Sequence, residues 1–526
     1  MSRRRSRRIC ILHWLVYRIL TGEKCSCIWQ MTALNHSWLL GDYVVRATPS
    51  KPDPNVRSNE KVDGGLYNTK DAPMHHEHTK WADIELAIEC KTQAGRDDPF
   101  EDDEEKDGAP EPTGYHRRKV LGQIMSYASL VFQNQHRTHA WTLLIIGDAA
   151  RLVRWDRSGV IASHKIEYVK QPITLTRFLW RLVRLSDLQR GHDPTAVRIR
   201  PDSVDYRLMV ERANKPVFQD GTPIGEHALL LFLNSLKNEQ PWWRLRVDDA
   251  RGQRHFLVGA PHFITSALAG RGTRGYVALD ESSPDASLVY LKDAWRVAHD
   301  RIPQEGKTLS DLNSDDNGGP VDGVPTMLYH GDVEEQVTQA QEAWRKKHPD
   351  EATCPLKTHR HYRLVVAEVG LPMSAFSDSR ELVGLIAWCI QAHHQAYTRK
   401  GYIHRDISAG NVLIYPKPMK TPEGKTEEIR TGLLTDWELA KSIYDADDGP
   451  RQPDRTGTWQ FMSASSLMNT SKRIIVQDDM ESFFHLLLYF AIRYLPHNCG
   501  DVGRFMDSYF DGHELEDGVY YGGEKK

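Results

Sequence analysis

The sequence is poor in cysteine and has none of the paired Cys-x-x-Cys spacings that build zinc sites. Its 526 residues include seven cysteines, an odd number scattered along the chain: Cys10, Cys25, Cys27, Cys90, Cys354, Cys389 and Cys499. Dense disulfide frameworks are typical of small secreted domains. We therefore expect no disulfide framework and an intracellular protein in a reducing compartment, either the nucleus or the cytoplasm.

Long hydrophobic runs are also missing. The chain begins with five arginines before a short apolar run, and His13 and Arg18 interrupt that run. A membrane-spanning helix needs about 20 apolar residues, and no small-residue cleavage site of a signal peptide follows. The arginines fit either a nuclear address or a solvated start of the chain. We expect no membrane partner.

Neither sign of charge is in excess, because 68 Lys and Arg face 71 Asp and Glu, which gives a formal net charge of −3. Proteins that coat nucleic acid are strongly basic, so this balance makes a nucleic-acid partner unexpected. The chain also has no internal repeat with a period of about 20–50 residues, which argues against a solenoid or a propeller.

What is present is the composition of an ordinary globular protein, with 40% hydrophobic and 26% charged residues. The length suits about two to four domains. Three stretches are rich in charge, proline or glycine and are predicted to be exposed loops: residues 96–113, 311–325 and 415–432.

Hydrophobic spacing predicts the elements between these stretches. Strands are predicted at Ile84–Cys90, Trp141–Ile146, Ala150–Trp155 and Val160–His164, and strands around a glycine-rich turn at 254–295. Helices are predicted at Lys119–Asn134, Leu175–Leu185, 226–239, Ser379–Lys400 and Asp479–Leu495. The order indicates an α+β fold. We expect a basic, poorly ordered segment at 1–45, an α/β domain at 46–195 with an acidic loop at 96–113, a β-rich lobe at 200–370 and a helical lobe at 371–526.

The strongest chemical signal is the run His404-Arg405-Asp406-Ile407-Ser408-Ala409-Gly410-Asn411, followed 25 residues later by Asp436. Phosphoryl transfer needs a carboxylate at the attacking hydroxyl and metal ligands on the phosphate side. Asp406 would receive or orient the hydroxyl proton, Asn411 would hold one Mg²⁺, and Asp436 would link the metal to the β- and γ-phosphates. The run follows a predicted helix and a Gly401 turn and precedes a buried strand, which is the context such a loop requires.

A glycine-rich turn lies upstream, with Gly270, Gly272 and Gly275 in a GxGxxG pattern that lets backbone amides approach phosphates. A predicted strand that begins at Leu288 ends on Lys292, which is placed to bind the α- and β-phosphates if a carboxylate steadies it. Glu305, at the start of the next helical stretch, is the expected partner. Asp293 and Asp300 are the alternatives.

These motifs together resemble the fungal-type protein kinases over roughly residues 200–500. The resemblance rests on GRGTRGY, VYLKDAW, GYIHRDISAGNVLI, LLTDWELAK, RTGTWQFMS and QDDMESFFHLLLY. It also implies that the stretch from Leu121 to Val160 is the N-terminal region of the family rather than an unrelated fusion.

The resemblance implies a bilobal protein-kinase-like fold and transfer of the γ-phosphate of ATP, with Mg²⁺, to Ser or Thr hydroxyls of a protein substrate. The implied catalytic residues are Asp406, Lys292 and Arg405. The implied nucleotide-binding residues are Gly270, Gly272, Gly275, Lys292, Glu305 and Asn411, and the implied metal ligands are Asn411 and Asp436. It further implies that 456–459 closes the activation segment and that Asp479 braces the backbone of the catalytic loop.

Three positions depart from the usual kinase pattern. Ser408 stands where most protein kinases carry a lysine, Glu438 replaces the glycine of Asp-Phe-Gly, and Ser465-Ser466 replace Pro-Glu. Ser408 favours one alternative, a small-molecule kinase of the aminoglycoside or choline type. The short stretch after the helix that begins near Asp479 favours another, a nucleotide-binding pseudokinase scaffold.

A second, weaker pattern lies in the N-terminal part, where Asp83, Glu89 and Lys91 form D…ExK and Gln123 and Tyr127 follow on the next helix. It looks like the core of restriction-type nucleases, in which two carboxylates bind Mg²⁺ and a lysine positions water. Only five residues separate Asp83 from Glu89, too few for a hairpin between metal ligands. The stretch 96–113 also carries nine acidic residues that would repel nucleic acid. We therefore expect an accessory domain without hydrolytic activity.

Overall fold

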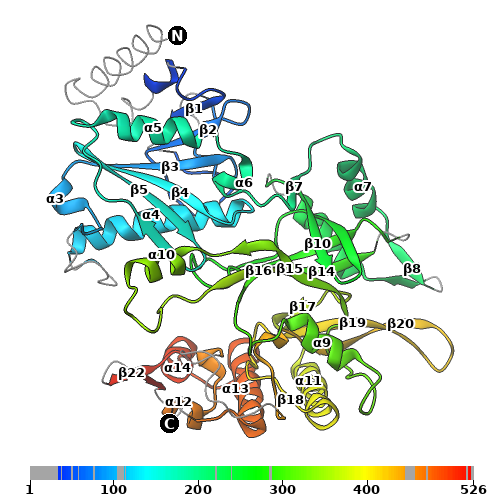
Figure 1. The fold of residues 1–526 in the computed structure, drawn as a ribbon. Coiled ribbons are helices and arrows are strands. Elements are labelled where there is room, and N and C mark those ends of the chain that lie inside the picture. Colours follow the sequence, from blue (N-terminus) through cyan, green and yellow to red (C-terminus); the bar gives the residue numbers. More distant parts are fainter. Residues whose placement is uncertain are drawn as a thin grey trace.

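Two large sheets and a group of helices make up the part of the chain that the computed structural model describes (Figure 1). The described residues are 33–36, 38–48, 51–56, 58–74, 78–102, 112, 114–219, 222–237, 240–283, 287–444, 457–469, 472–516 and 519–522. The predicted basic segment therefore lies mostly outside the described residues, as does most of the predicted acidic loop. Across the described residues, no helix has the length and apolar character needed to cross a membrane.

The first sheet has six strands in sequence order: β1 (Tyr43–Ala47), β2 (Gly64–Asn68), β3 (Ile84–Lys91), β4 (Ala140–Ile146), β5 (Ala149–Asp156) and β6 (Gly159–Ala162). All neighbouring strands are antiparallel except β3 and β4, which are parallel. A parallel pair needs a crossover connection, and the chain supplies it with α4 (Tyr115–Asn134).

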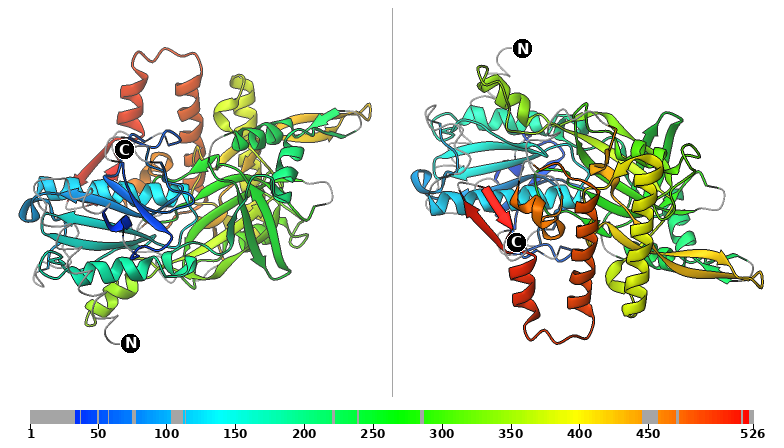
Figure 2. Two further views of the ribbon diagram at one scale, coloured as in Figure 1. Left: turned by 90° about the horizontal axis from the view of Figure 1, so that it is seen from above. Right: turned by 90° about the horizontal axis from the view of Figure 1, so that it is seen from below.

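Helices cover both faces of this sheet (Figure 2). Helix α4 packs on one face through residues such as Ile124 and Phe132. The other face holds η1 (Ala33–His36) and α5 (Pro172–Leu182). The predicted strands and helices of this region are confirmed, with bounds that differ by a few residues.

The second sheet runs in the order β15-β16-β14-β13-β11-β10-β7, and β12 pairs with β13. Its strands are β7 (Ala196–Arg198), β10 (Trp243–Asp249), β11 (Gly252–Val258), β12 (Phe263–Ile264), β13 (Arg274–Asp280), β14 (Leu288–Val297), β15 (Met327–Val337) and β16 (His359–Val366). Helices α7 (Val204–Ala213) and α8 (Glu226–Leu236) pack on one face against Leu257 and Val277. The glycine-rich turn connects β12 to β13, and α9 (Glu305–Asn313) connects β14 to β15.

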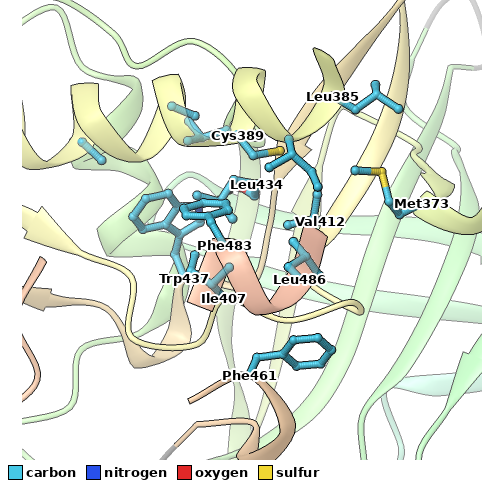
Figure 3. Packing of buried hydrophobic residues seen from close by; sticks show 14 of the residues in the cluster. Met373, Leu385, Cys389, Ile407, Val412, Leu434, Trp437, Phe461, Phe483 and Leu486 are labelled. Carbon is cyan, nitrogen blue, oxygen red and sulfur yellow. Dashed lines mark hydrogen bonds between the residues drawn. The ribbon is translucent and has the colours of Figure 1, made fainter. Parts of the chain in front are cut away.

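The helical region is built on α11 (Ser379–Lys400) and α13 (Val476–Tyr494), with α12 (Ala464–Met468) and α14 (Val502–Tyr509) beside them. Helix α11 has the predicted bounds because both of its ends are capped. The Asp378 side chain accepts from the Glu381 amide, and Gly401 ends the helix with φ of 70°. Cys389 of α11 packs with Trp437 and with Phe483 of α13 in the core (Figure 3).

Short elements complete the described chain. They are α3 (Ala94–Asp97), α6 (Asp187–Arg190), α10 (Ala340–Lys347), η2 (Met373–Ala375), η3 (Trp437–Leu439), η4 (Trp459–Phe461), β8 (Val217–Gln219), β9 (Thr222–Ile224), β17 (Leu371–Pro372), β18 (Tyr402–Ile403), β19 (Val412–Lys420), β20 (Thr426–Leu434), β21 (Lys441–Ser442), β22 (His513–Glu516) and β23 (Val519–Gly522).

The prediction of an exposed loop at 415–432 is wrong. Strands β19 and β20 form a long antiparallel hairpin here, with Val412 opposite Leu434 and Lys420 opposite Thr426 (Figure 1). The prolines suggested a loop because they cannot donate to a strand ladder. Strand β17 pairs with β19 only at Leu413 and Ile414, so Pro416 and Pro418 face an edge where no donor is needed.

The prediction of an exposed acidic loop is also wrong at its first residues. Asp97 belongs to α3 and is buried, and Asp98 is buried in an ion pair with Arg151 at 2.8 Å. Of the loop predicted at 311–325, residues 314–325 are irregular, but 311–313 are the last residues of α9, and Val321 and Val324 are buried. Among the described cysteines Cys90 is disulfide-bonded, so the expected absence of disulfides does not hold there, whereas Cys354, Cys389 and Cys499 are free.

Candidate active site

Lys292 is the centre of a charged cluster between the second sheet and the helical region. It lies within β14, opposite Gly275 of β13. Its Nζ atom donates to Glu305 Oε2 at 2.7 Å and to Asp436 Oδ1 at 2.7 Å. Glu305 is the first residue of α9 and is buried, so the predicted partner is the one that the structure brings to Lys292.

The alternative partners of Lys292 lie elsewhere. Asp293 points to the other face of β14, as the alternation along a strand requires, and binds His361 Nε2 at 2.6 Å and Arg363 Nε at 2.9 Å. Asp300 is exposed in the turn after β14.

Asp436 directly follows Thr435, after the end of β20, and has a left-handed φ of 60°. Such a conformation in a non-glycine residue is often found at functional sites. The preceding Thr435 donates its backbone amide to Asn411 O at 2.8 Å and its hydroxyl to the same oxygen at 3.1 Å. These two hydrogen bonds hold the Asp436 turn beside the Asn411 loop.

Asp406 is buried and receives donors on both carboxylate oxygens. Oδ1 accepts from the Thr458 amide at 2.8 Å and from the Thr458 hydroxyl at 2.7 Å. Oδ2 accepts from Asn411 Nδ2 at 3.1 Å, and the same nitrogen donates to Asp406 O at 2.8 Å. Because the amide nitrogen of Asn411 is used in this way, its oxygen is the atom left to bind a cation.

Asp479 of α13 holds the backbone of this loop, as the resemblance implied. Its carboxylate accepts from the amides of His404 at 2.9 Å and Arg405 at 3.1 Å, and also from His393 Nε2 at 2.7 Å. Arg405 has a left-handed φ of 71°, and its guanidinium lies 3.4 Å from Leu439 O. Arg405 therefore connects the loop to the segment after Asp436. Of the segment implied at 456–459, residue 456 lies outside the described residues.

The glycine-rich turn is held partly by the first sheet. Arg157, which follows β5, donates to Ala267 O at 2.9 Å and accepts from the Gly270 amide at 2.8 Å through its carbonyl. A Cβ at Gly272 would lie 2.3 Å from the Arg157 guanidinium, and one at Gly275 would lie 1.9 Å from the Tyr290 hydroxyl. A side chain at Gly272 or Gly275 would thus displace a neighbouring side chain, whereas Gly270 has room for a Cβ but a left-handed φ of 93° that favours glycine.

Sequence reasoning missed two charged residues of this cluster. Arg271 of the glycine-rich turn contacts Glu438 Oε2 at 3.0 Å and Asp436 Oδ2 at 3.8 Å. Glu438 was noted only as a departure, yet it lies 3.6 Å from Lys292 Nζ. The ligand oxygens of Glu305, Asp436 and Glu438 all lie within 4.8 Å of one another. The position of Glu438, two residues after Asp436, was the signal that could have identified it.

The electrostatics follow from this crowding. Burial alone lowers the pKa of Lys292, but Asp436, Glu305 and Glu438 outweigh burial and hold that pKa well above its ordinary value. Burial alone raises the pKa of Asp436, but Lys292 and Arg271 hold it below the ordinary value. Burial raises the pKa of Glu305 to about 7. Within the described residues, the three carboxylates of this cluster therefore face only two side-chain cations, Lys292 and Arg271. A divalent cation that bound here would be attracted by the remaining negative charge.

A strand lysine paired with a helix glutamate, an HRDxxxxN loop and a carboxylate after the next hairpin are the parts used by protein-kinase-like phosphotransferases. The family model described as fungal protein kinase matches residues 111–491, and the chain belongs to this family. The match includes Leu121 to Val160, so the prediction that this stretch is part of the family is confirmed. No curated protein matches the chain. Family membership implies a protein kinase that takes its phosphate from ATP.

Proposed function

We propose that the chain is a protein kinase that transfers the γ-phosphate of ATP, in the presence of Mg²⁺, to Ser or Thr hydroxyls of proteins. The observation that carries this proposal is the position of Lys292 Nζ, 2.7 Å from both Glu305 and Asp436. The second sheet with α9 is the N-lobe at about 200–370, the helical region is the C-lobe at about 371–526, and residues 46–195 are an accessory domain.

Nucleotide binding is assigned to the cluster around Lys292. The lysine ammonium contacts the α- and β-phosphates, Glu305 orients that ammonium, and the turn at Gly270, Gly272 and Gly275 lies over the phosphates. The donor set fits Mg²⁺, which prefers carboxylate and amide oxygens, and Asp436 and Asn411 would hold it. A bound Mg²⁺ would supply positive charge that stabilises the negative charge developing on the transferred phosphate.

Asp406 is assigned to the acceptor hydroxyl. Thr458 and Asn411 hold its carboxylate in one orientation, so that it can accept the hydroxyl proton as the phosphorus is attacked. Arg405 acts on the geometry of the loop rather than on the phosphates, since its guanidinium lies against Leu439 O.

The small-molecule kinase remains the second candidate because Ser408, and no lysine, follows Asp406 by two residues and is buried. The contact between Thr458 and Asp406 supports a protein substrate. It places the segment around Thr458 beside the carboxylate that would accept the proton of the acceptor hydroxyl. The scaffold alternative is less well supported, since Lys292, Glu305, Asp406, Asn411 and Asp436 are all present.

The nucleotide site is tested by thermal-shift titration of the purified chain with ATP, with and without Mg²⁺. We expect a metal-dependent shift that Asp436→Asn abolishes, because an amide cannot neutralise Mg²⁺ as a carboxylate does. Asp300→Asn is the matched control, because Asp300 is exposed and outside the cluster. An ATP shift that is independent of metal and unchanged in Asp436→Asn would contradict the assignment.

A further inference from the structure

A second polar cluster lies on the first sheet, away from Lys292. Glu89 and Lys91 lie two residues apart on β3 and therefore on one face of the strand. The Lys91 ammonium contacts the Glu89 carboxylate and donates to Gln123 Oε1 at 3.0 Å. From α4, the Tyr127 hydroxyl donates to Glu89 Oε2 at 2.9 Å and accepts from Gln123 Nε2 at 2.6 Å.

Asp63 supplies a second carboxylate to this cluster. Asp63 directly precedes β2, whose first residue, Gly64, lies opposite Ile88 of β3. Asp63 therefore comes at the end of this antiparallel ladder, next to Glu89. Asp63 Oδ2 also accepts from the Cys90 amide at 2.9 Å, which holds this carboxylate beside the strand between Glu89 and Lys91.

This position corrects the reasoning drawn from the sequence. Asp83, which was taken as the first carboxylate of the pattern, forms an ion pair with Arg198 at 2.5 Å and is not part of the cluster. The first carboxylate is Asp63, which directly precedes the adjacent strand β2 and lies 26 residues before Glu89. The objection that the spacing is too tight for ligands on two strands therefore no longer applies.

Two of the nine acidic residues at 96–113 are enclosed in the fold rather than exposed beside the cluster. Asp97 and Asp98 are buried, and Asp98 is paired with Arg151. Lys119 is exposed on α4 one turn before Gln123, which places the two on one side of the helix. Arg118 is exposed next to it. These cations are available to the neighbouring phosphates of a polyanion.

The Glu89 carboxylate is enclosed, whereas the other members of the cluster are partly exposed. The Glu89 side chain is 2% exposed and that of Lys91 is 23% exposed. Asp63 and Gln123 are half-buried. Two carboxylates held close together in this way are a suitable site for a divalent cation.

We propose that Asp63 and Glu89 bind a divalent cation, Mg²⁺ or Mn²⁺, and that this site, with Lys91 and Gln123, hydrolyses phosphodiester bonds of nucleic acid. The cation contacts a non-bridging phosphate oxygen, and Lys91 positions the attacking water. The water oxygen forms a new bond to phosphorus, and the bond from phosphorus to one sugar oxygen breaks. One proton of the water passes to solvent, the departing sugar oxygen takes a proton from solvent, and no electrons are exchanged.

The test uses the full chain carrying Asp436→Asn, so that the kinase-like metal site is removed. This protein is incubated with supercoiled plasmid DNA and, separately, with single-stranded RNA in Mg²⁺, in Mn²⁺ and in EDTA. We expect metal-dependent cleavage of at least one of the two polymers. Added Asp63→Asn, Glu89→Gln or Lys91→Ala should each lower the rate by about 10²-fold or more, the scale of losing a group that acts in the transition state.

Asp83→Asn is the matched control and should leave cleavage unchanged, because Asp83 lies outside the cluster. A second readout is Mn²⁺ binding measured by electron paramagnetic resonance, which should be lost in Glu89→Gln and retained in Asp83→Asn. Thermal unfolding of each variant shows whether it folds. If Lys91→Ala does not fold, the isosteric variant Asp63→Asn replaces it in the test. Absence of metal-dependent cleavage of both polymers, or cleavage that persists in Asp63→Asn, would overturn the proposal.

Discussion

At the scale of single residues, Lys292 balances three carboxylates that would otherwise repel one another. Its side chain is 12% exposed, and Glu305, Asp436 and Glu438 all lie within 3.6 Å of its Nζ atom. Removing one partner from a buried ion pair leaves uncompensated charge and costs about 3–5 kcal/mol. The charge of the lysine therefore contributes to folding as well as to nucleotide binding.

We expect Lys292→Met to lower the free energy of unfolding in EDTA by about 3 kcal/mol, and we expect Mg²⁺ to recover part of that loss by binding the carboxylates. Urea unfolding with and without Mg²⁺ measures both effects. Lys307→Met is the matched control, because Lys307 is exposed on α9. Equal stability of Lys292→Met and Lys307→Met would show that the cluster is not held by this lysine.

At this scale the sequence predicted Lys292, Asp406, Asn411 and Asp436 because each belongs to a local motif with known spacing. Glu305 was predicted only as the acidic residue at the start of the next helical stretch, with Asp293 and Asp300 as alternatives. Arg271 and Asp63 could not be predicted in the same way. Arg271 reaches Glu438 across 167 residues of chain, and Asp63 reaches β3 through strand register. Such contacts depend on pairing between strands and turns, which no short pattern encodes.

At the scale of elements, the hairpin β19–β20 passes so close to α11 that only glycine fits at one position. A Cβ at Gly432 would lie 2.2 Å from Leu385 O and 2.7 Å from Cys389 Sγ. This close approach brings β20 against the helix that precedes the catalytic loop, and so places Asp436 at the end of the strand.

We expect Gly432→Ala to destabilise the protein by about 1–3 kcal/mol, the usual cost of overpacking. Gly384→Ala is the control on α11 itself, where a Cβ would meet nothing within 4 Å. In an exposed helix position that change should stabilise by about 0.4–1 kcal/mol. Chemical denaturation of both variants measures the difference. A neutral Gly432→Ala would show that β20 does not pack closely on α11.

Helices and strands were predicted correctly where apolar residues recurred at one regular spacing throughout the element. Helix α11 was predicted with its observed bounds, since its apolar spacing, its Asp378 cap and Gly401 all agree. The hairpin at 415–432 was missed because prolines and charges dominate its sequence, and its strands are defined by pairing with each other rather than by burial.

At the scale of the whole molecule, buried charges connect the segment between α6 and β7 to the second sheet. Arg363 of β16 contacts Asp193 at 2.6 Å and Asp293 of β14 at 2.9 Å. Burial alone would raise the pKa of Asp193, but Arg363 outweighs it and holds the pKa below its ordinary value. The pKa of Asp293 is lowered in the same way by His361 and Arg363.

These shifts give a pH dependence with a definite sign. A carboxyl whose pKa is lower in the folded state stabilises the fold above its ordinary pKa of about 3.9, and loses this contribution as the pH falls below that value. We expect Asp193→Asn to be less stable than the parent chain at pH 7, with a difference that shrinks below about pH 4. Urea unfolding across this range measures it. A difference that is constant with pH would contradict the ion pair.

We propose that Asp406 serves phosphate transfer to protein hydroxyls. The most direct measurement incubates the chain with γ-labelled ATP and Mg²⁺, in parallel with generic protein acceptors and with small alcohols such as aminoglycosides and choline. We predict labelled Ser or Thr in protein, reduced by about 10²-fold or more in Asp406→Ala. Label only in the small alcohols, or no label in any acceptor, would contradict the account.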